Sequence, residues 1–425
     1  MAKVNVARGM RDLLPETMRK RRLVIERIEH VFRAYGFDPQ ETPAVERIET
    51  LMGKYGDEGS KLIFKILARG EAGERGECDM ALRYDLTVPL ARVVAMNQQL
   101  KMPFKRYQIQ PVWRADRPQK GRFREFYQCD VDIVGTTNIM AEAECLAVVH
   151  DSLKALGFER FTIRLNDRRL LRAMVSHIGA IDQEFAVIGA LDKLDKIGEE
   201  GVRGELNGLG LDSAQADSLF AYLKGADIPD AEGIETELLQ IRDHALQLGV
   251  SADNILIDRT LARGLDYYTG PVFETVLDDA KIGSVSGGGR YDGLIGMFLG
   301  RDIPAVGVSL GLERLITILE ERGALDDVHS GAQVFVSVFS AAEQQASLEA
   351  ARVLRQKGLR VELSYRMGKL GKQFKSASQN HIPFVVVIGP DDVEQGCIQI
   401  KDLAAGEQHS MSLEAASDWL LERLD

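Results

Sequence analysis

The sequence predicts an α+β protein with a large mixed core and a smaller α/β domain at its C-terminus, and three observations predict this division. Two strand patterns within residues 106–135 flank the polar loop 115–121. Residues 167–250 show short helical patterns, acidic charge and frequent glycine, which favour a helical insertion. The last hundred residues alternate between strand and helix patterns. We therefore expect two domains, residues 1–325 and 326–425.

The N-terminal part opens with a predicted helix over residues 15–35. Val24, Ile28 and Val31 recur at helical spacing, and Gly36 ends the pattern. The segments expected after this helix are an extended stretch at 37–43, a strand at 62–67 and a polar turn at 69–79.

The second central strand carries four side chains at period 2, which therefore share one face: Phe126, Gln128, Asp130 and Asp132. The three glycines 287–289 are expected to break the chain, because glycine tolerates backbone conformations that other residues do not. The other elements expected in this part are strands at 254–257 and 272–277, a helix at 311–321 and a linker at 322–332.

The C-terminal hundred residues predict a small α/β domain with a mostly parallel sheet. Its expected strands are 334–339, 359–363, 384–388 and 397–401, and its expected helices are 342–357, 369–380 and 413–424.

Composition excludes several classes of protein. Hydrophobic residues make up 45% and charged residues 28%, which is typical of globular chains and not of disordered ones. No run of 18 apolar residues occurs, so we expect no membrane-spanning helix. The N-terminus lacks the apolar stretch of a signal peptide, and none of the four cysteines forms a CxxC pair. These features predict a reducing, cytoplasmic setting.

Charge is distributed unevenly along the chain. The net charge of −11 argues against a nucleic-acid partner. Residues 101–124 and 352–375, however, each hold eight basic residues against one acidic residue, a net charge of +7 apiece. Two such basic segments favour a polyanionic partner bound at two places. The alternative is that both are solvated surfaces paired with nearby acids.

Arginine and carboxylate residues suggest two kinds of subsite. No P-loop (GxxxxGK[ST]) or dinucleotide-binding glycine motif occurs. Arginines in strand or turn context instead indicate a polyphosphate site assembled on a sheet, and they are Arg83, Arg114, Arg122, Arg124, Arg263, Arg290 and Arg314. Asp85, Thr87, Gln128, Asp132, Tyr267 and Tyr268 could line a pocket for an ammonium or imidazolium ligand. The alternative is that Gln128 and Asp132 merely satisfy each other or a neighbouring strand.

Six segments together resemble the class II aminoacyl-tRNA synthetases, and within that class the histidyl-tRNA synthetase family. Residues 9–12 (GMRD) resemble its N-terminal signature, and the helix that ends at Gly36, with Thr42 and Pro43, resembles motif 1 of the class. Residues 112–126 (VWRADRPQKGRFREF) resemble motif 2, and 307–315 (GVSLGLERL) resemble motif 3. Residues 261–270 (LARGLDYYTG) and 287–293 (GGGRYDG) are similar to the two histidine-specific signatures.

The resemblance implies an antiparallel sheet of six or more strands that carries the site, and a C-terminal anticodon-binding domain. It implies a homodimer, since motif 1 belongs to the dimer interface, and a reaction in which L-histidine, ATP with Mg²⁺, and tRNA(His) are the partners. No protein-bound metal site is implied. The 167–250 insertion is expected near the tRNA acceptor stem.

The implied site residues fall into four groups. Arg263 and Arg114 are expected to be catalytic, with Arg263 on the α-phosphate. The residues expected to bind ATP are Arg114, Asp116, Arg122, Phe126 and Arg314. Those expected to bind histidine are Asp85, Leu86, Thr87, Gln128, Asp132, Arg263, Tyr267 and Tyr268. Those expected to contact tRNA are Arg117, Gln119, Arg366, Lys369 and Lys372.

Two features qualify the resemblance. Many bacterial members have glutamate where this chain has Asp85 and Asp132, so the shorter side chains resemble the eukaryotic branch. The alternatives are a synthetase-like regulatory subunit of a phosphoribosyltransferase, which should lack the anticodon domain or some of the arginines, and a class II synthetase for proline, threonine or glycine, which the two histidine signatures disfavour.

Overall fold

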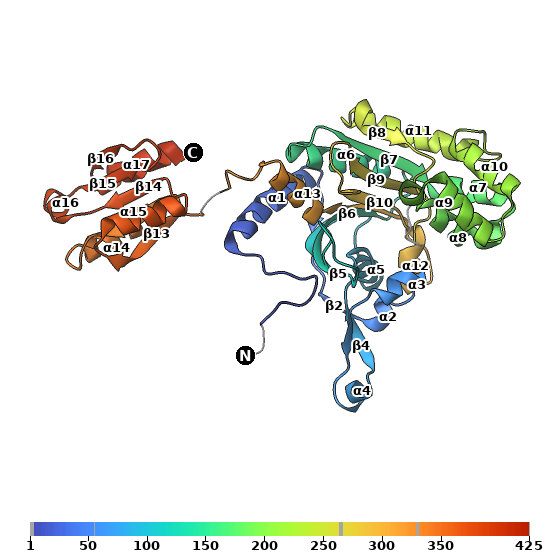
Figure 1. Cartoon of the computed structure of the whole chain (residues 1–425), viewed down its shortest axis with the longest axis horizontal. Helices are drawn as coiled ribbons and strands as arrows, with labels where there is room; N and C mark the ends of the chain where they lie inside the picture. The colour runs from blue at the N-terminus through green and yellow to red at the C-terminus, as the bar shows by residue number, and fades with distance from the viewer. Residues whose placement is uncertain (1–3, 55, 263–266, 329–330, 425) are drawn as a thin grey trace. The chain divides into compact units, whose positions relative to one another are not determined.

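The computed structural model describes residues 4–54, 56–262, 267–328 and 331–424, with the side chains of 56–58 excepted. By its internal contacts the chain divides into two compact units, Met1–Asp12 with Arg22–Glu321, and Leu13–Arg21 with Arg322–Asp425 (Figure 1). No helix within the described ranges is both long and apolar enough to cross a membrane.

An eight-stranded sheet forms the centre of the larger unit, in the order β1-β5-β6-β11-β10-β9-β7-β8. The β1–β5 and β7–β8 pairs are parallel and the other five are antiparallel, which agrees with the antiparallel core that the resemblance implies. The strands are β1 (Asp38–Pro39), β5 (Phe104–Trp113), β6 (Glu125–Val134), β7 (Phe161–Asp167), β8 (Ile255–Ile257), β9 (Pro271–Leu277), β10 (Ser286–Arg290) and β11 (Ala305–Gly311).

The predicted face of β6 is present in the structure. β5 and β6 pair along their full length, and β6 has β11 on its other side. Side chains alternate between the two faces of a strand. Asp130 and Asp132 therefore lie on one face, and Cys129, Val131 and Ile133 lie on the other, all of them buried.

Residues 287–289 correct one expectation, because they lie inside β10 and do not break the chain. A Cβ atom on Gly288 would lie 2.1 Å from the carbonyl oxygen of Gly307, and one on Gly289 would lie 2.7 Å from that of Pro271. Glycine is required there by the close approach of neighbouring strands and not by a turn.

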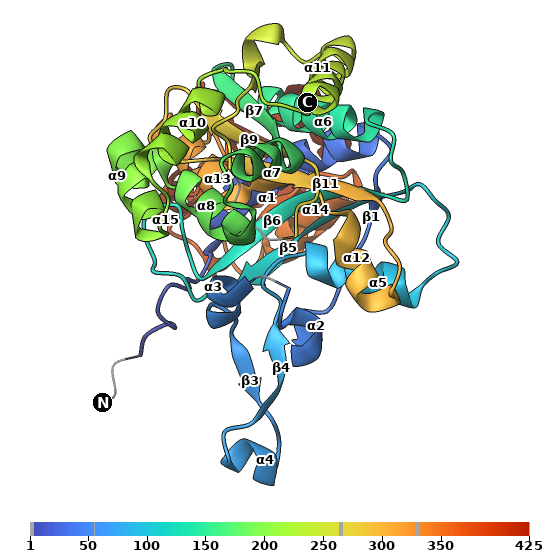
Figure 2. The ribbon, with the colours of Figure 1, turned by 90° about the vertical axis from the view of Figure 1, so that its right-hand side faces the viewer.

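A second, three-stranded sheet has the order β2-β4-β3, with β2 (Val45–Arg47), β3 (Lys65–Leu67) and β4 (Cys78–Leu82). Figure 2 shows α4 (Glu71–Glu74) at the far end of the β3–β4 pair. The predicted polar turn at 69–79 is thus too simple, since it contains a short helix and the start of a strand.

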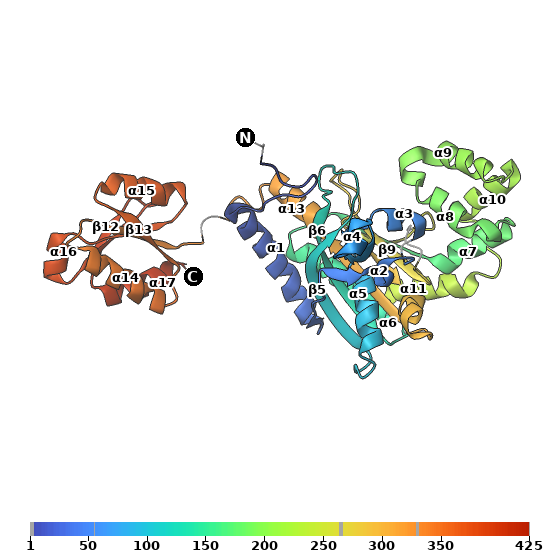
Figure 3. The ribbon, with the colours of Figure 1, turned by 90° about the horizontal axis from the view of Figure 1, so that it is seen from below.

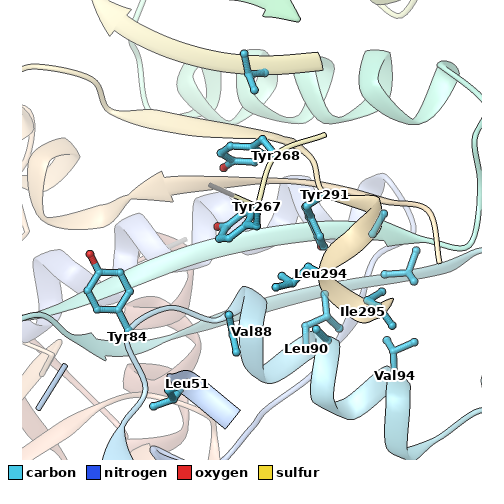
Figure 4. Packing of buried hydrophobic residues seen from close by; sticks show 14 of the residues in the cluster. Leu51, Tyr84, Val88, Leu90, Val94, Tyr267, Tyr268, Tyr291, Leu294 and Ile295 are labelled. Carbon is cyan, nitrogen blue, oxygen red and sulfur yellow. The ribbon is translucent and has the colours of Figure 1, made fainter. Parts of the chain in front are cut away.

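The core helices of the larger unit pack on these sheets. α6 contacts β6, β10 and β11, and α12 packs against α5. Figure 4 shows Tyr267, Tyr268 and Tyr291 in one apolar cluster with residues of α5 and α12. The helices are α1 (Pro15–Ala34), of which Arg22–Ala34 belong to this unit, and α2 (Ile48–Leu51), α3 (Gly56–Lys61), α5 (Thr87–Met96), α6 (Met140–Ala155), α12 (Asp292–Leu299) and α13 (Leu312–Glu321).

The helical insertion follows β7 directly. Asp167 caps its first helix by accepting a hydrogen bond from the backbone nitrogen of Arg169. Figure 3 shows α7 to α10 grouped together. The helices are α7 (Arg168–His177), α8 (Glu184–Leu191), α9 (Leu194–Gly208), α10 (Ser213–Leu223) and α11 (Glu232–Gln247), with short 3-10 turns at Ile181–Gln183 and Ala252–Asn254.

The C-terminal part of the smaller unit holds a five-stranded sheet in the order β13-β12-β14-β15-β16. Only β13–β12 and β12–β14 are parallel, so the predicted mostly parallel sheet is wrong in half of its pairs. β16, which no strong period-2 pattern marks, adds the last antiparallel pair. The elements are β12 (Val334–Val338), α14 (Gln344–Gln356), β13 (Val361–Met367), α15 (Leu370–Gln379), β14 (Phe384–Val387), α16 (Pro390–Gln395), β15 (Ile398–Asp402), β16 (Gln408–Met411) and α17 (Leu413–Leu424).

Candidate active site

A cavity of about 230 Å³ opens on the sheet face that carries Asp130 and Asp132. The segments around it come from the loop before α5, from β6, from β10 and β11, and from the start of α13. It brings together most of the site residues predicted from the sequence, namely Asp85, Thr87, Arg114, Asp116, Arg122, Phe126, Gln128, Asp132, Tyr267, Tyr268 and Arg314.

The remaining predicted residues lie elsewhere. Leu86 is buried outside the cavity, and its carbonyl oxygen accepts a hydrogen bond from Arg106. Arg117 and Gln119 are exposed in the loop between β5 and β6. Arg263 lies outside the described residues. Arg366, Lys369 and Lys372 are exposed at the end of β13 and the start of α15.

Asp132 is held from three sides. Nη2 of the fully buried Arg106 lies 2.7 Å from Asp132 Oδ2, and the Tyr291 hydroxyl donates to Asp132 Oδ1. On the third side is Gly307, where a Cβ atom would lie 1.9 Å from Asp132 Oδ1. Burial raises the pKa of Asp132, and the Arg106 charge acts against that rise.

The end of the cavity that carries the aspartates contains both hydrogen-bond donors and hydrogen-bond acceptors. Asp85 Oδ1 accepts from the backbone nitrogen of Val88 at 3.0 Å. Gln128 Nε2 donates to Ser309 Oγ at 3.0 Å, whereas its Oε1 is buried without a hydrogen-bond partner in the described part of the chain. Such an oxygen is suited to a donor from a ligand, because leaving a buried acceptor unpaired costs about 1–3 kcal/mol.

Two tyrosines close this end. The rings of Tyr267 and Tyr268 lie 4.9 Å apart, and Tyr267 is also 6.0 Å from Tyr291. Burial raises the pKa of Tyr267 well above its usual value, so its phenol stays protonated at neutral pH.

The other end of the cavity is cationic. Arg114 Nε donates to the Tyr84 carbonyl oxygen at 3.0 Å, and its guanidinium carbon lies 5.2 Å from the centre of the Phe126 ring. Arg314 Nη1 donates to the Ser284 carbonyl oxygen. These backbone contacts fix two guanidinium groups in the cavity, and that of Arg114 lies beside an aromatic face, an arrangement that suits a nucleotide with its phosphates.

The outer part of the cationic end contains an ion pair. Arg122 Nη2 lies 3.1 Å from Asp116 Oδ1, and the Arg122 side chain is about half exposed. A polyphosphate could take the place of Asp116 on Arg122, because both present oxygen atoms to the guanidinium.

Three of the seven arginines predicted at a polyphosphate site lie off the cavity and bond within the protein instead, and one of them is Arg124, whose Nε donates to the Asp116 carbonyl oxygen at 3.0 Å. Arg83 is buried, and its guanidinium donates to the carbonyl oxygens of Thr42 and Pro111 and to Gln110 Oε1. Arg290 pairs with Glu142 on α6 and with Asp292. None of the three lines the cavity.

The first basic segment is similarly satisfied within the protein. Arg106 pairs with Asp132, Lys105 with Glu144 and Lys120 with Glu321. The interpretation of this whole segment as a polyanion-binding surface is therefore too broad, and the cavity retains Arg114 and Arg122 from it.

Sequence reasoning missed several residues of the site. The missed residues that line the cavity are Asp130, Ser309, Tyr291 and Glu313. Arg106 does not line it but pairs with Asp132, which does. Asp130 could have been found, since it shares the period-2 face of Gln128 and Asp132. Arg106 could not, because its position opposite Asp132 depends on the pairing register of β5 and β6.

Comparison with known proteins gives consistent matches. Residues 9–315 match the family described as "Histidyl-tRNA synthetase", and residues 333–423 match "Anticodon binding domain". A histidine–tRNA ligase of Aeropyrum pernix is 45% identical over 96% of this chain and 95% of its own, and one of Gloeobacter violaceus is 41% identical over the whole of both chains. The crystal structure of a histidyl-tRNA synthetase from Nostoc is 32% identical, covers 99% of this chain and 100% of its own, and superposes with a TM-score of 0.84.

Proposed function

The chain belongs to the histidyl-tRNA synthetase family and is a histidine–tRNA ligase, and we propose that the cavity described above is where histidine is activated with ATP. One observation carries this proposal: a carboxylate-lined pocket and a pair of fixed arginines face the same enclosed space. An amino acid presents an ammonium group at one end and a carboxylate at the other, and this carboxylate must reach the α-phosphate of ATP.

In the amino acid subsite, Asp85, Thr87 and Gln128 hold the α-ammonium group. Gln128 Oε1 has its lone pairs available for this contact. Asp132 and Tyr268 bind the imidazole nitrogens. A pocket of this kind rejects isosteres without those nitrogens by roughly 10⁴-fold, because its own buried polar groups would be left unpaired.

Three residues support that pocket indirectly. The Leu86 carbonyl oxygen and Asp132 share the guanidinium of Arg106, so Leu86 helps to hold the carboxylate in place. Tyr267 packs beside Tyr268 and fixes its ring.

In the ATP subsite, Arg114 and Arg314 hold the phosphates, Phe126 stacks on the adenine, and Arg122 exchanges Asp116 for the γ-phosphate. The described residues contain no group of three or more histidine, cysteine, aspartate or glutamate side chains that could hold a metal ion. We propose that Mg²⁺ enters with ATP, as part of the substrate.

The reaction needs no side-chain nucleophile. The histidine carboxylate attacks the α-phosphorus of ATP, which gives histidyl-adenylate and pyrophosphate. A ribose hydroxyl at the 3′ end of tRNA(His) then attacks the activated carbonyl and releases AMP. Arg114 offsets negative charge on the α-phosphate, and we assign the same task to Arg263.

We propose the following for the rest of the molecule. Residues 1–325 form the catalytic domain and 326–425 the anticodon-binding domain, with tRNA contacts at Arg117, Gln119, Arg366, Lys369 and Lys372. The enzyme is a homodimer through its motif 1 segment, which size measurement in solution tests. It is cytoplasmic, which suits cysteines that are not joined in disulfides.

The regulatory-subunit alternative would require loss of the anticodon domain or of the phosphate-binding arginines. Residues 333–423 match an anticodon-binding domain, and Arg114 and Arg314 both line the cavity. Neither loss has occurred.

Histidine-dependent exchange of labelled pyrophosphate into ATP tests the proposed site. We expect exchange with L-histidine and none with glutamine or proline, and we expect Arg114→Ala to lower the exchange rate by about 10²-fold or more. Equal exchange with another amino acid, or an unaffected Arg114→Ala variant, would remove the cavity from the reaction.

A further inference from the structure

Asp130 lies at the centre of the sheet face that forms the amino acid subsite, and the roles proposed above leave it without a task. Its side chain is 3% exposed and lines the cavity. Strand register places Gln108 of β5 on one side of it and Ser309 of β11 on the other. Any ligand that reaches Asp132 from the cavity must therefore pass close to Asp130.

The hydrogen bonds around Asp130 satisfy it only in part. Ser309 donates to it, and Gln128 Nε2 lies at a long 3.4 Å from its Oδ1. Gln108 offers no donor, since both hydrogens of its amide are directed elsewhere, to Thr42 Oγ1 at 2.9 Å and to Gln110 Oε1 at 2.7 Å.

The charges around Asp130 are unbalanced. In the described part of the chain, the ionisable groups near it are Asp132 on its own strand, Arg106 on β5, Asp85 in the loop before α5 and Arg83 after β4. Arg106 is already paired with Asp132 at 2.7 Å. Arg83 donates to the carbonyl oxygens of Thr42 and Pro111 and to Gln110. Within the described ranges neither guanidinium forms an ion pair with Asp130, and a negative charge held there without a paired cation would be costly at this depth.

We propose that Asp130 is a third carboxylate of the amino acid subsite, which holds a proton while the subsite is empty and releases it to solvent when the α-ammonium group of the substrate enters. The cation of the ligand then replaces the proton as the partner of the carboxylate. This inference rests on the proposed function, and it makes Asp130 a specificity-determining residue in addition to Asp85 and Asp132.

The titration behaviour of the empty site supports this assignment. Burial, with the neighbouring Asp132 charge, raises the pKa of Asp130 to about 7, although Arg106 opposes the rise. A raised pKa means that the carboxyl is protonated below pH 7 and ionised above it. Histidine binding should therefore strengthen as pH rises through the neutral range, and it should release protons from Asp130 there.

Calorimetric titration of the full-length protein with L-histidine at pH 7, in two buffers of different ionisation enthalpy, measures the protons exchanged. We expect Asp130→Asn to release fewer protons than the wild type and to raise the histidine KM in pyrophosphate exchange by about tenfold, with the ATP KM unchanged. Equal proton release by the two proteins overturns the proposal.

Asp167→Asn is the matched control. Asp167 is also a buried aspartate with a pKa raised by burial, but it lies at the end of β7 and outside the cavity. Asparagine can still cap α7, so this variant should fold and keep the wild-type proton release. Loss of proton release in the control as well would mean that the effect is not specific to Asp130.

A second variant keeps the proposal testable if Asp130→Asn does not fold. The Ser309 hydrogen bond lowers the pKa of Asp130, so Ser309→Ala should raise it and move the pH dependence of the histidine KM to higher pH. An unshifted profile would contradict the proposal. Absence of any histidine-dependent exchange in the wild type would instead contradict the proposed function, so the two failures are distinct.

Discussion

The amino acid subsite depends on the absence of a side chain at Gly307. At Gly307 a Cβ atom would lie 1.9 Å from Asp132 Oδ1, 2.6 Å from its Cγ and 2.9 Å from the Val131 carbonyl oxygen. Asp132 cannot simply retreat, because Arg106 and Tyr291 hold both of its oxygens. Glycine is therefore needed at this position because it leaves room for the Asp132 carboxylate, and not because it allows an unusual backbone conformation.

We predict that Gly307→Ala raises the histidine KM by about 10²-fold, since displacement of a binding group by about 1 Å has effects of this size. The measurement is pyrophosphate exchange over a range of histidine concentrations. Gly293→Ala is the control, because a Cβ atom there meets nothing within 4 Å. A normal histidine KM for Gly307→Ala would show that Asp132 is not held as described.

The limit of prediction at this scale is clear from Asp132 and its partners. The period-2 pattern placed Gln128, Asp130 and Asp132 on one face, and the family resemblance assigned a role to two of them. Their partners Arg106, Tyr291 and Ser309 come from three other segments. Which of these residues meet depends on strand register, and one sequence without its fold does not determine register.

At the scale of elements, the segment before α1 is attached to the ATP subsite. Arg11 pairs with Glu313 at the start of α13, and its guanidinium carbon lies 3.5 Å from the centre of the Phe123 ring. The backbone nitrogen of Arg124 donates to the Gly9 carbonyl oxygen at 2.8 Å. These contacts join the β5–β6 loop to α13, the two elements that carry Arg122 and Arg314.

We predict that Arg11→Ala loosens this attachment and raises the ATP KM about three- to tenfold, while the histidine KM stays within twofold. The Arg11 side chain is 34% exposed, so loss of its ion pair should cost about 1 kcal/mol of stability or less. Exchange kinetics and thermal melting measure the two effects. Arg8→Ala is the control, since Arg8 is exposed and has no contact of this kind among the described residues. A change confined to melting temperature would reduce Arg11 to a structural role.

Prediction of elements succeeded where the hydrophobic pattern was strong. α1, β5 and α13 lie within two residues of their expected bounds, and β6 begins three residues after its expected start. β10 was missed because its glycines carry no side chains from which to read a period, and β4 was missed because it is short and polar at its start. In both cases neighbouring strands, and not local preference, decide the conformation.

At the scale of the whole molecule, the two basic segments differ in which of their side chains form ion pairs. In the first, Lys105, Arg106 and Lys120 pair with carboxylates. In the second, Arg352 pairs with Glu349 and Lys357 with Asp418. Arg366, Lys369 and Lys372 have no ion pair among the residues that the structure describes. Equal net charge in the sequence thus conceals a difference in how much of that charge remains for a partner.

The exposed group at the end of β13 and the start of α15 has the composition of a nucleic-acid contact. Tyr365 is 98% exposed and stands next to Arg366. An exposed aromatic ring among basic residues is typical of surfaces on which single-stranded bases stack. The backbone between Arg366 and Lys369 is fixed, since the Gly368 nitrogen donates to the carbonyl oxygens of Val338 and Phe339.

We predict that changing Arg366, Lys369 and Lys372 together to glutamate weakens tRNA binding and leaves pyrophosphate exchange within twofold of the wild type, because exchange does not involve tRNA. If all three contact phosphates, the slope of log affinity against log salt concentration should fall by about two to three. The control variant changes Arg352, Arg355 and Lys357 to glutamate, which alters the net charge by the same amount. These three are already engaged, with Glu349, the Val361 carbonyl oxygen and Asp418, so the control should keep more of the salt slope. Equal loss in both variants would mean that tRNA responds to the total charge of the domain and not to this surface.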